Sequence, residues 1–176
     1  MAGKQDYETP RWVIQTIEWR FGIAFDVDVA ASKQNKRCHL FISEEDDALG
    51  ESSVWGGVVT HDHPVTFWCN PPYSNVMPWI PMAYENTVFS GDECWMLLKN
   101  DSSTKWYQKC IALADEMYLI TGKRISFEID GVPDPGNNFA SMLVRFRNKD
   151  DRPARVEHWD IFKDNERRQS VEAIEE

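Results

Sequence analysis

A chain of 176 residues with 42% hydrophobic content, eight tryptophans and nine phenylalanines can bury one substantial core, so we expect a single domain. Its formal net charge of −10 argues against a protein that binds nucleic acid over a wide basic surface, because such binding depends on many phosphate contacts. No stretch reaches the roughly 18 apolar residues that cross a bilayer, and no signal-peptide pattern opens the chain, so a cytosolic location is expected.

The helical and extended patterns alternate along the chain. Thr9 is a favourable helix N-cap, Pro10 suits the first helical position, and apolar residues recur at helical spacing over residues 10–21 before Gly22. After this helix we expect a strand (23–29), a short polar helix (32–38), an irregular segment (43–64), a strand (65–69), a helix (76–89), a strand (94–98), a helix (103–114) and a strand (117–121).

Two further strands, 125–129 and 140–146, are expected on either side of a loop rich in Pro, Gly and Asn at 131–138. The alternation predicts one α/β domain over residues 1–162, with helices on both faces of a mostly parallel sheet and antiparallel strands at its end. Charge dominates the last residues, so 163–176 is expected to be a mobile tail.

The string Asn70-Pro71-Pro72-Tyr73 carries the most specific chemical signal. A given four-residue string of this kind occurs by chance about once in a thousand chains of this length. It begins where the strand 65–69 ends, and ligands of open α/β sheets bind outside the carboxyl ends of strands. The alternative is that the two prolines only end a strand and that the tyrosine packs on the surface.

These residue types suit methyl transfer to an aromatic amine, whose lone pair is delocalised into the ring. Two acceptors on the amine hydrogens, the Asn70 side-chain oxygen and the Pro71 carbonyl, would favour a pyramidal nitrogen with its lone pair toward a methyl donor. The prolines fix the turn, and Tyr73 can stack on a base that has left the duplex. We therefore predict a catalytic site made of Asn70, Pro71, Pro72 and Tyr73.

Five segments of the chain together resemble a known family. They are Tyr7-Glu8-Thr9-Pro10, the run 25–31, Asp47-Ala48-Leu49 followed by Trp55, the run 68–74 and the run 122–127. In this order they resemble the small phage and prophage DNA N6-adenine methyltransferases of the Dam type, over roughly residues 7–147. The resemblance implies a Rossmann-like three-layer methyltransferase fold, S-adenosylmethionine as methyl donor, and an adenine extruded from DNA as the acceptor.

The resemblance also implies the cofactor contacts. They would be Thr9, Pro10, Asp28, Ala30, Asp47 and Leu49. Thr9 and Pro10 would approach the methionine end, whereas Asp47 would accept a hydrogen bond from the adenine amine of the cofactor. Asp26 and Asp28 alternate with valines on one strand, so either could be the acidic contact, and we take Asp28. No glycine-rich turn follows this strand, which predicts a different cofactor loop.

Contacts to DNA must come from a local patch in so acidic a chain. The candidates are Ser74, Lys99, Lys123 and Arg124, with Arg145 and Arg147 as further cations. Each cation could instead be a solvated edge charge. The widely spaced cysteines and the run 61–63, His-Asp-His, lack partners at metal-ligand spacing, so we expect neither metal nor disulfide.

Two rival functions stay open at this point. Similar turns serve methylation of cytosine N4, of RNA adenine and of protein glutamine, and the chemistry of Asn70 to Tyr73 does not separate these acceptors. A non-catalytic acidic binding protein with the same fold is the rival of another class; it predicts no cofactor binding and no effect of Asn70→Ala. The sequence indicates neither a target motif nor an oligomeric state.

Overall fold

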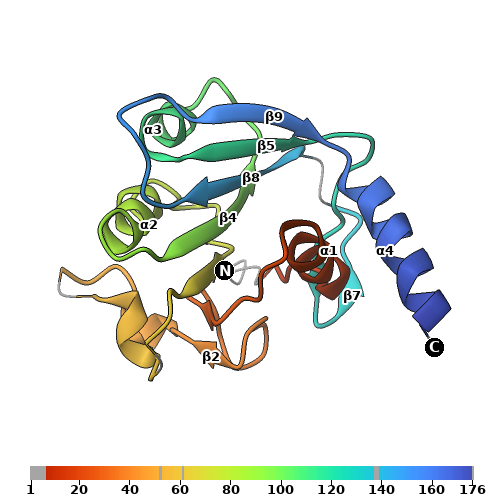
Figure 1. The fold of residues 1–176 in the computed structure, drawn as a ribbon, viewed down its shortest axis with the longest axis horizontal. Coiled ribbons are helices and arrows are strands. Elements are labelled where there is room, and N and C mark those ends of the chain that lie inside the picture. The colour runs from red at the N-terminus through yellow and green to blue at the C-terminus, as the bar shows by residue number, and fades with distance from the viewer. Residues whose placement is uncertain (1–6, 52, 61, 137–138, 176) are drawn as a thin grey trace.

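A seven-stranded sheet forms the middle layer of the computed structural model, which describes residues 7–51, 53–60, 62–136 and 139–175 (Figure 1). The strand order is β2 (Leu40–Phe41), β1 (Val27–Asp28), β3 (Thr66–Cys69), β4 (Glu93–Lys99), β8 (Ser141–Phe146), β5 (Glu116–Ile120) and β9 (Arg155–Trp159). Neighbouring strands are parallel except that β8 runs antiparallel to both β4 and β5. The prediction of a mostly parallel α/β sheet is confirmed.

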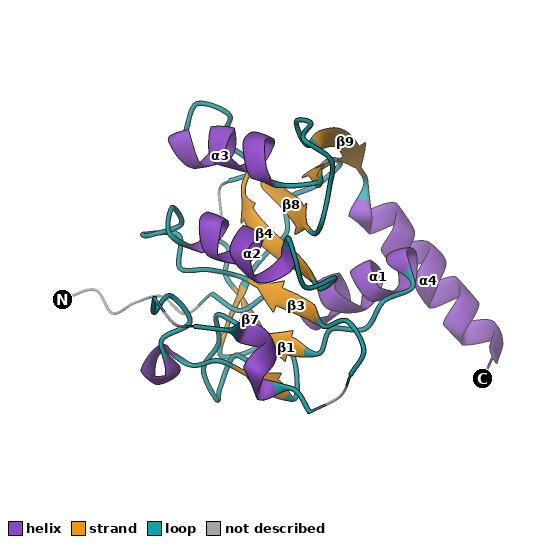
Figure 2. Ribbon diagram, turned by 60° about the vertical axis from the view of Figure 1, so that its left-hand side comes forward, coloured by secondary structure: helices purple, strands orange, loops and turns teal. Residues whose placement is uncertain are grey.

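Helices cover both faces of the sheet, as Figure 2 shows: α2 (Trp79–Thr87) and α3 (Lys105–Leu113) lie on one side, and α1 (Arg11–Phe21) and α4 (Ile161–Glu175) on the other. The two faces bury separate apolar clusters. On β3, Phe67 and Cys69 belong to the cluster under α2 and α3, whereas Trp68 belongs to the cluster under α1. This arrangement confirms the three-layer sandwich.

The first helix begins one residue later than the sequence predicts. Val13, Ile14 and Ile17 form its buried stripe, and Gly22 ends it in the left-handed conformation (φ 64°) by donating its N–H to the carbonyl of residue 18. The N-cap position is held by Pro10, and no side chain caps the helix. Thr9 is therefore not the cap, which leaves its hydroxyl for another role.

The segment 32–38, predicted as a helix, is a series of turns. Side chains satisfy its backbone locally: the Asn35 side-chain oxygen accepts the Ser32 N–H (2.6 Å), and the Ser32 hydroxyl accepts the Asn35 N–H (3.3 Å). Such bonds compete with helical ones. The irregular segment 43–64 holds two 3-10 helices, η1 (Glu44–Asp46) and η2 (Trp55–Val58).

The two late strands do not pair with each other. β6 (Glu128–Ile129) forms a tight hairpin with β7 (Val132–Pro133), and the two residues between them, Asp130 and Gly131, both have positive φ (52° and 73°). Positive φ at both positions is typical of the two-residue turns that join hairpins. Part of the expected loop 131–138 is thus strand, and its residues 137–138 lie outside the described ones.

Most of the segment expected as a mobile tail is the helix α4, which lies against α1 (Figure 1). Asp164 is buried there; it pairs with Arg20 of α1 (2.7 Å) and accepts a hydrogen bond from the indole of Trp159 (2.8 Å). One charge of this segment thus has its partner far away in the sequence. No helix among the described residues is long and apolar enough to cross a membrane.

Candidate active site

The turn 70–73 begins directly after β3, at the carboxyl edge of the parallel strands β1, β3 and β4. Its backbone is closed by the Asn75 N–H, which donates to the Pro72 carbonyl (3.0 Å). Pro71 is buried and Pro72 exposed. The turn thus lies at the edge where open α/β sheets bind their ligands, as the sequence predicts.

In the side-chain amide of Asn70, the nitrogen makes a hydrogen bond and the oxygen makes none among the described residues. Its Nδ2 donates to the backbone carbonyl of Tyr7 (3.1 Å). Its Oδ1 is buried and has no hydrogen-bond partner among the described residues. Because the Tyr7 carbonyl can only accept, it fixes the amide with the oxygen turned to the site. A buried acceptor without a partner suits a ligand that brings an N–H group.

Tyr73 packs within an aromatic cluster, which we define as Tyr73, Phe127 and Phe139. Its ring meets Phe127 and Phe139 nearly at right angles, with centroids 5.9 Å and 5.2 Å away. The Lys99 ammonium lies 5.3 Å from the Tyr73 centroid and 4.4 Å from that of Phe139. Burial raises the pKa of Tyr73, so its hydroxyl stays protonated, and this hydroxyl has no partner among the described residues.

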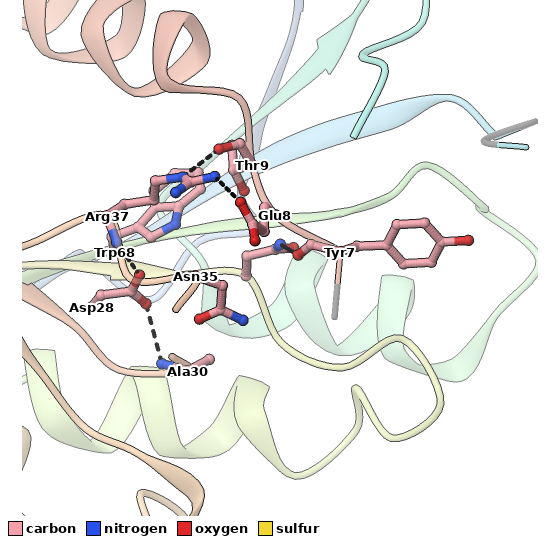
Figure 3. A pocket seen from close by; sticks show the side chains of 9 residues that line it. Tyr7, Glu8, Thr9, Asp28, Ala30, Asn35, Arg37 and Trp68 are labelled. Atoms are coloured by element: carbon pink, nitrogen blue, oxygen red, sulfur yellow. Dashed lines mark hydrogen bonds and ion pairs between the residues drawn. The ribbon is translucent and has the colours of Figure 1, made fainter. Parts of the chain in front are cut away.

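A small polar pocket opens beside Asn70 (Figure 3). Its lining comes from three parts of the chain: Tyr7, Glu8, Thr9, Asp28, Ala30, Asn35, Arg37, Trp68 and Asn70. The free space is about 10 Å³, which is room for a single water molecule. A nucleoside-sized ligand can therefore enter only if part of this lining moves.

Arg37 holds the segment 7–9 against the pocket, a role that no pattern in the sequence indicates. Its side chain is only 7% exposed; its Nε donates to the Thr9 carbonyl and its Nη2 to a Glu8 carboxylate oxygen 3.1 Å away (Figure 3). Glu8 in turn pairs through its backbone with Glu128 at both N–H and C=O. Glu8 also lines the pocket and is a second acid that sequence reasoning did not select.

Asp28 rather than Asp26 lines the pocket. The Asp28 side chain is buried, and its oxygens accept the backbone N–H groups of Ala30 (3.3 Å) and Arg37 (2.9 Å). Burial raises the pKa of Asp28 to about 6, although the two hydrogen bonds oppose the shift. Asp26 instead accepts the N–H of Thr66 on β3 (2.8 Å).

The raised pKa of Asp28 predicts a pH-dependent stability. The folded state binds this proton more tightly than the unfolded state (about 6 against 3.8), so the contribution is fully present below pH 4 and is lost as the pH rises through about 6. Between pH 5 and pH 7 the wild type should lose about 1 kcal/mol of unfolding free energy relative to Asp28→Asn, which cannot ionise. Urea denaturation of both proteins at the two pH values measures this difference; an unchanged difference would contradict it.

The other predicted cofactor residues are divided between two places. Thr9 is buried, and its hydroxyl has no partner among the described residues; Pro10 is buried beside it. Asp47 is exposed with a positive φ of 50°, Leu49 packs under α2, and neither lines the pocket. Asp47 and Leu49 follow β2. The Trp55 indole donates to the backbone carbonyl of residue 48, which lies between these two residues (2.9 Å).

The cations predicted to meet DNA also differ in position. Lys123 and Arg124 are exposed on the turn after β5, at the carboxyl edge of the sheet, and Ser74 is exposed in the turn after Tyr73. Two further predicted cations, Arg145 and Arg147, lie at the opposite edge. There they pair with acids at the start of β4 and β5, namely Glu93, Asp115 and Glu116. Arg145 and Arg147 are thus not brought to the site.

In the described part of the chain, no group of three or more His, Cys, Asp or Glu residues is placed so that it could hold a metal ion. His61 of the run 61–63 lies outside the described residues.

Comparison with known proteins gives matches over most of the chain. The family model described as DNA N-6-adenine-methyltransferase (Dam) matches residues 2–168. A DNA N-6-adenine-methyltransferase of Haemophilus phage HP1 (strain HP1c1) is 36% identical over 150 residues, which cover 84% of this chain and 82% of that protein. A protein of the same name from Escherichia phage T1 is 35% identical over 125 residues, or 71% of this chain and 48% of the phage protein.

Proposed function

The chain belongs to the DNA N-6-adenine-methyltransferase (Dam) family, and on that premise we propose that the turn 70–73 passes a methyl group from S-adenosylmethionine to N6 of an adenine extruded from DNA. Membership makes the chain an enzyme that methylates adenine N6 in DNA. The observation that carries the site assignment is the buried Asn70 Oδ1, whose orientation is fixed and which has no partner among the described residues.

The residues that line the polar pocket suit the methionine end of S-adenosylmethionine, which would enter once part of this lining moves. Asp28 and Glu8 supply carboxylates suited to an ammonium group, and the Thr9 hydroxyl is a buried donor that needs an acceptor such as a carboxylate. Pro10 and Ala30 complete this part of the site. Asp47 and Leu49, in the segment after β2, would hold the adenosine part. When bound, the cofactor supplies an electrophilic methyl group on a sulfonium sulfur.

The residues of the turn activate the adenine amine. The Asn70 Oδ1 and the Pro71 carbonyl each accept a hydrogen bond from one N–H of the amine, which draws the lone pair out of conjugation with the ring and directs it toward the methyl group. Tyr73 supplies an aromatic face for the base. The methylated amine then loses one proton to solvent. Because acceptors alone perform this task, no side chain with a pKa near neutrality is required.

Few residues are available for electrostatic contact with the DNA backbone. Lys99, Lys123 and Arg124 are the proposed phosphate contacts, and Ser74 adds a hydroxyl next to the turn. With so few cations the enzyme depends on local contacts, so its affinity for DNA should fall only modestly with added salt. We place the protein in the cytoplasm of a bacterial or phage-infected cell, where its DNA substrate is found.

Thr9→Val tests the cofactor site. The valine keeps the volume of threonine and removes a hydroxyl that has no protein partner, so S-adenosylmethionine should bind about 5- to 10-fold more weakly with little change in stability. Isothermal titration calorimetry measures the binding. The control is Thr16→Val, whose hydroxyl donates to the Trp12 carbonyl (2.6 Å) on α1 and whose loss should cost stability but not binding. If the wild type does not bind S-adenosylmethionine, the proposal is rejected. If Thr9→Val binds it as tightly as the control Thr16→Val, Thr9 does not contact the cofactor.

A further inference from the structure

Buried polar atoms without a partner concentrate at the proposed site. Among the described residues they are Thr9 Oγ1, Asn70 Oδ1, Tyr73 OH, Ser141 Oγ and Arg168 Nε. The first three belong to residues already assigned to the cofactor or the turn, and Arg168 lies on α4. Ser141 is 1% exposed and has no assigned role. A buried hydroxyl without a hydrogen bond destabilises a fold, so its presence calls for an explanation.

The sheet places Ser141 at the same edge as Asn70. Ser141 is the first residue of β8, and its register partner is Lys99, the last residue of β4. Because β8 is antiparallel to β4, its beginning lies at the carboxyl edge of the parallel strands, where the turn 70–73 also lies. The Ser141 hydroxyl thus lies at the carboxyl edge of the sheet, and not at the opposite edge, where Arg145 lies.

The same face of the sheet carries both side chains. On β8, Met142 belongs to the cluster under α2 and α3, and Leu143 to the cluster under α1; alternation therefore turns Ser141 to the α1 side. On β3, Trp68 belongs to the α1 side and lines the polar pocket together with Asn70. Ser141 and Asn70 thus lie on the same side of the sheet, with β4 between their strands.

Lys99 and the aromatic cluster lie over this part of the sheet. The Lys99 ammonium is directed at the faces of Tyr73 and Phe139, and no carboxylate in the described part of the chain pairs with it. Aromatic faces, a cation and an unused hydroxyl are a set that suits a heteroaromatic base. A base brings ring nitrogens, which are the acceptors that a hydroxyl donor lacks here.

We propose that Ser141 is a base-reading residue whose hydroxyl donates a hydrogen bond to a ring nitrogen of the extruded adenine, N1 or N7. N1 is bonded to the carbon that carries the N6 amine, and N7 is bonded to the next ring carbon on the other side of the amine, so a bond to either one would help to direct this amine toward Asn70 Oδ1. Ser141 would thereby select for adenine and orient it without taking part in bond formation. The proposal rests on the proposed function and deepens it.

The test pairs Ser141→Ala with substrates that lack one ring nitrogen. Duplex oligonucleotides carry adenine, 1-deaza-adenine or 7-deaza-adenine at the target, each opposite an abasic site so that the cost of breaking a base pair is the same. With the wild type, kcat/KM should fall about 10-fold on the analogue that lacks the bonded nitrogen. Ser141→Ala should already be about 10-fold slower on adenine and lose nothing further on that analogue.

Stability separates this role from a structural one. Ser141→Ala removes an unpaired hydroxyl, so its urea midpoint should equal or exceed that of the wild type. The control is Thr87→Val, whose hydroxyl is buried but bonded to the Ala83 carbonyl (2.8 Å) on α2; it should lose stability and keep the wild-type response to the analogues. A destabilised Ser141→Ala with unchanged kinetics, or equal losses on all three bases, would overturn the proposal. A wild type that methylates no adenine would overturn the proposed function as well.

Discussion

Asn70→Ala is expected to lower kcat for methyl transfer by about 10²- to 10³-fold, the usual effect of deleting one preorganised polar group that acts on the transition state. The variant loses the acceptor Oδ1 and the hydrogen bond from Nδ2 to the Tyr7 carbonyl. The second loss concerns one neutral bond, so the free energy of unfolding should fall by no more than about 1 kcal/mol. Single-turnover rates on duplex DNA and urea denaturation measure the two effects separately.

Asn86→Ala is the matched control. Asn86 lies on α2, where its side chain accepts the Trp55 N–H (2.9 Å) and donates to the Met82 carbonyl (3.0 Å). Its loss should reduce stability and leave the transfer rate unchanged. Asn70→Asp, which keeps acceptor oxygens but cannot donate to Tyr7, should retain more activity than Asn70→Ala. Equal rates for Asn70→Ala and the wild type would show that the turn only ends a strand.

Arg37→Met is expected to destabilise the protein by about 3–5 kcal/mol, because removal of one partner leaves a buried charge without compensation. The methionine keeps the length of the side chain, but Glu8 loses its cation and the Thr9 carbonyl loses its donor. The Glu8 side chain is only 11% exposed, so solvent replaces little of the lost interaction. Since Thr9 and Glu8 both line the polar pocket, binding of S-adenosylmethionine should weaken as well.

Urea denaturation at pH 7 measures the effect, with Arg167→Met as the control. Arg167 is 70% exposed and pairs with Asp164 on α4, so its removal should cost less than about 1 kcal/mol. The double variant Glu8→Gln with Arg37→Met removes both charges and should regain part of the lost stability. A loss below 1 kcal/mol in Arg37→Met alone would mean that Arg37 does not hold the segment 7–9.

Local signals account for the parts of the molecule that could be predicted. The turn 70–73 could be placed because an apolar strand runs directly into a rare string, and α1 because its apolar stripe ends at a glycine. The hairpin β6–β7 has a local signal too, because Asp130-Gly131 between short apolar runs is a strong indicator of a two-residue turn. The Pro, Gly and Asn residues that follow it favour the longer loop 131–138 instead.

Contacts between distant residues account for the rest. Arg37 reaches Thr9 and Glu8 across 28 and 29 positions, so no window around residue 37 indicates its role. Asp164 meets Arg20 across 144 positions, so the charged sequence of α4 taken alone predicts a mobile tail. Composition reports how many charges a segment has, but not which of them find a buried partner.

The most direct test of the central claim is the identity of the base that receives the methyl group. The wild-type protein is incubated with unmethylated duplex DNA and isotopically labelled S-adenosylmethionine, the DNA is digested to nucleosides, and the labelled product is identified by mass spectrometry. We predict that the label is found in N6-methyladenine. Label in N4-methylcytosine, or no transfer to DNA at all, would contradict the account.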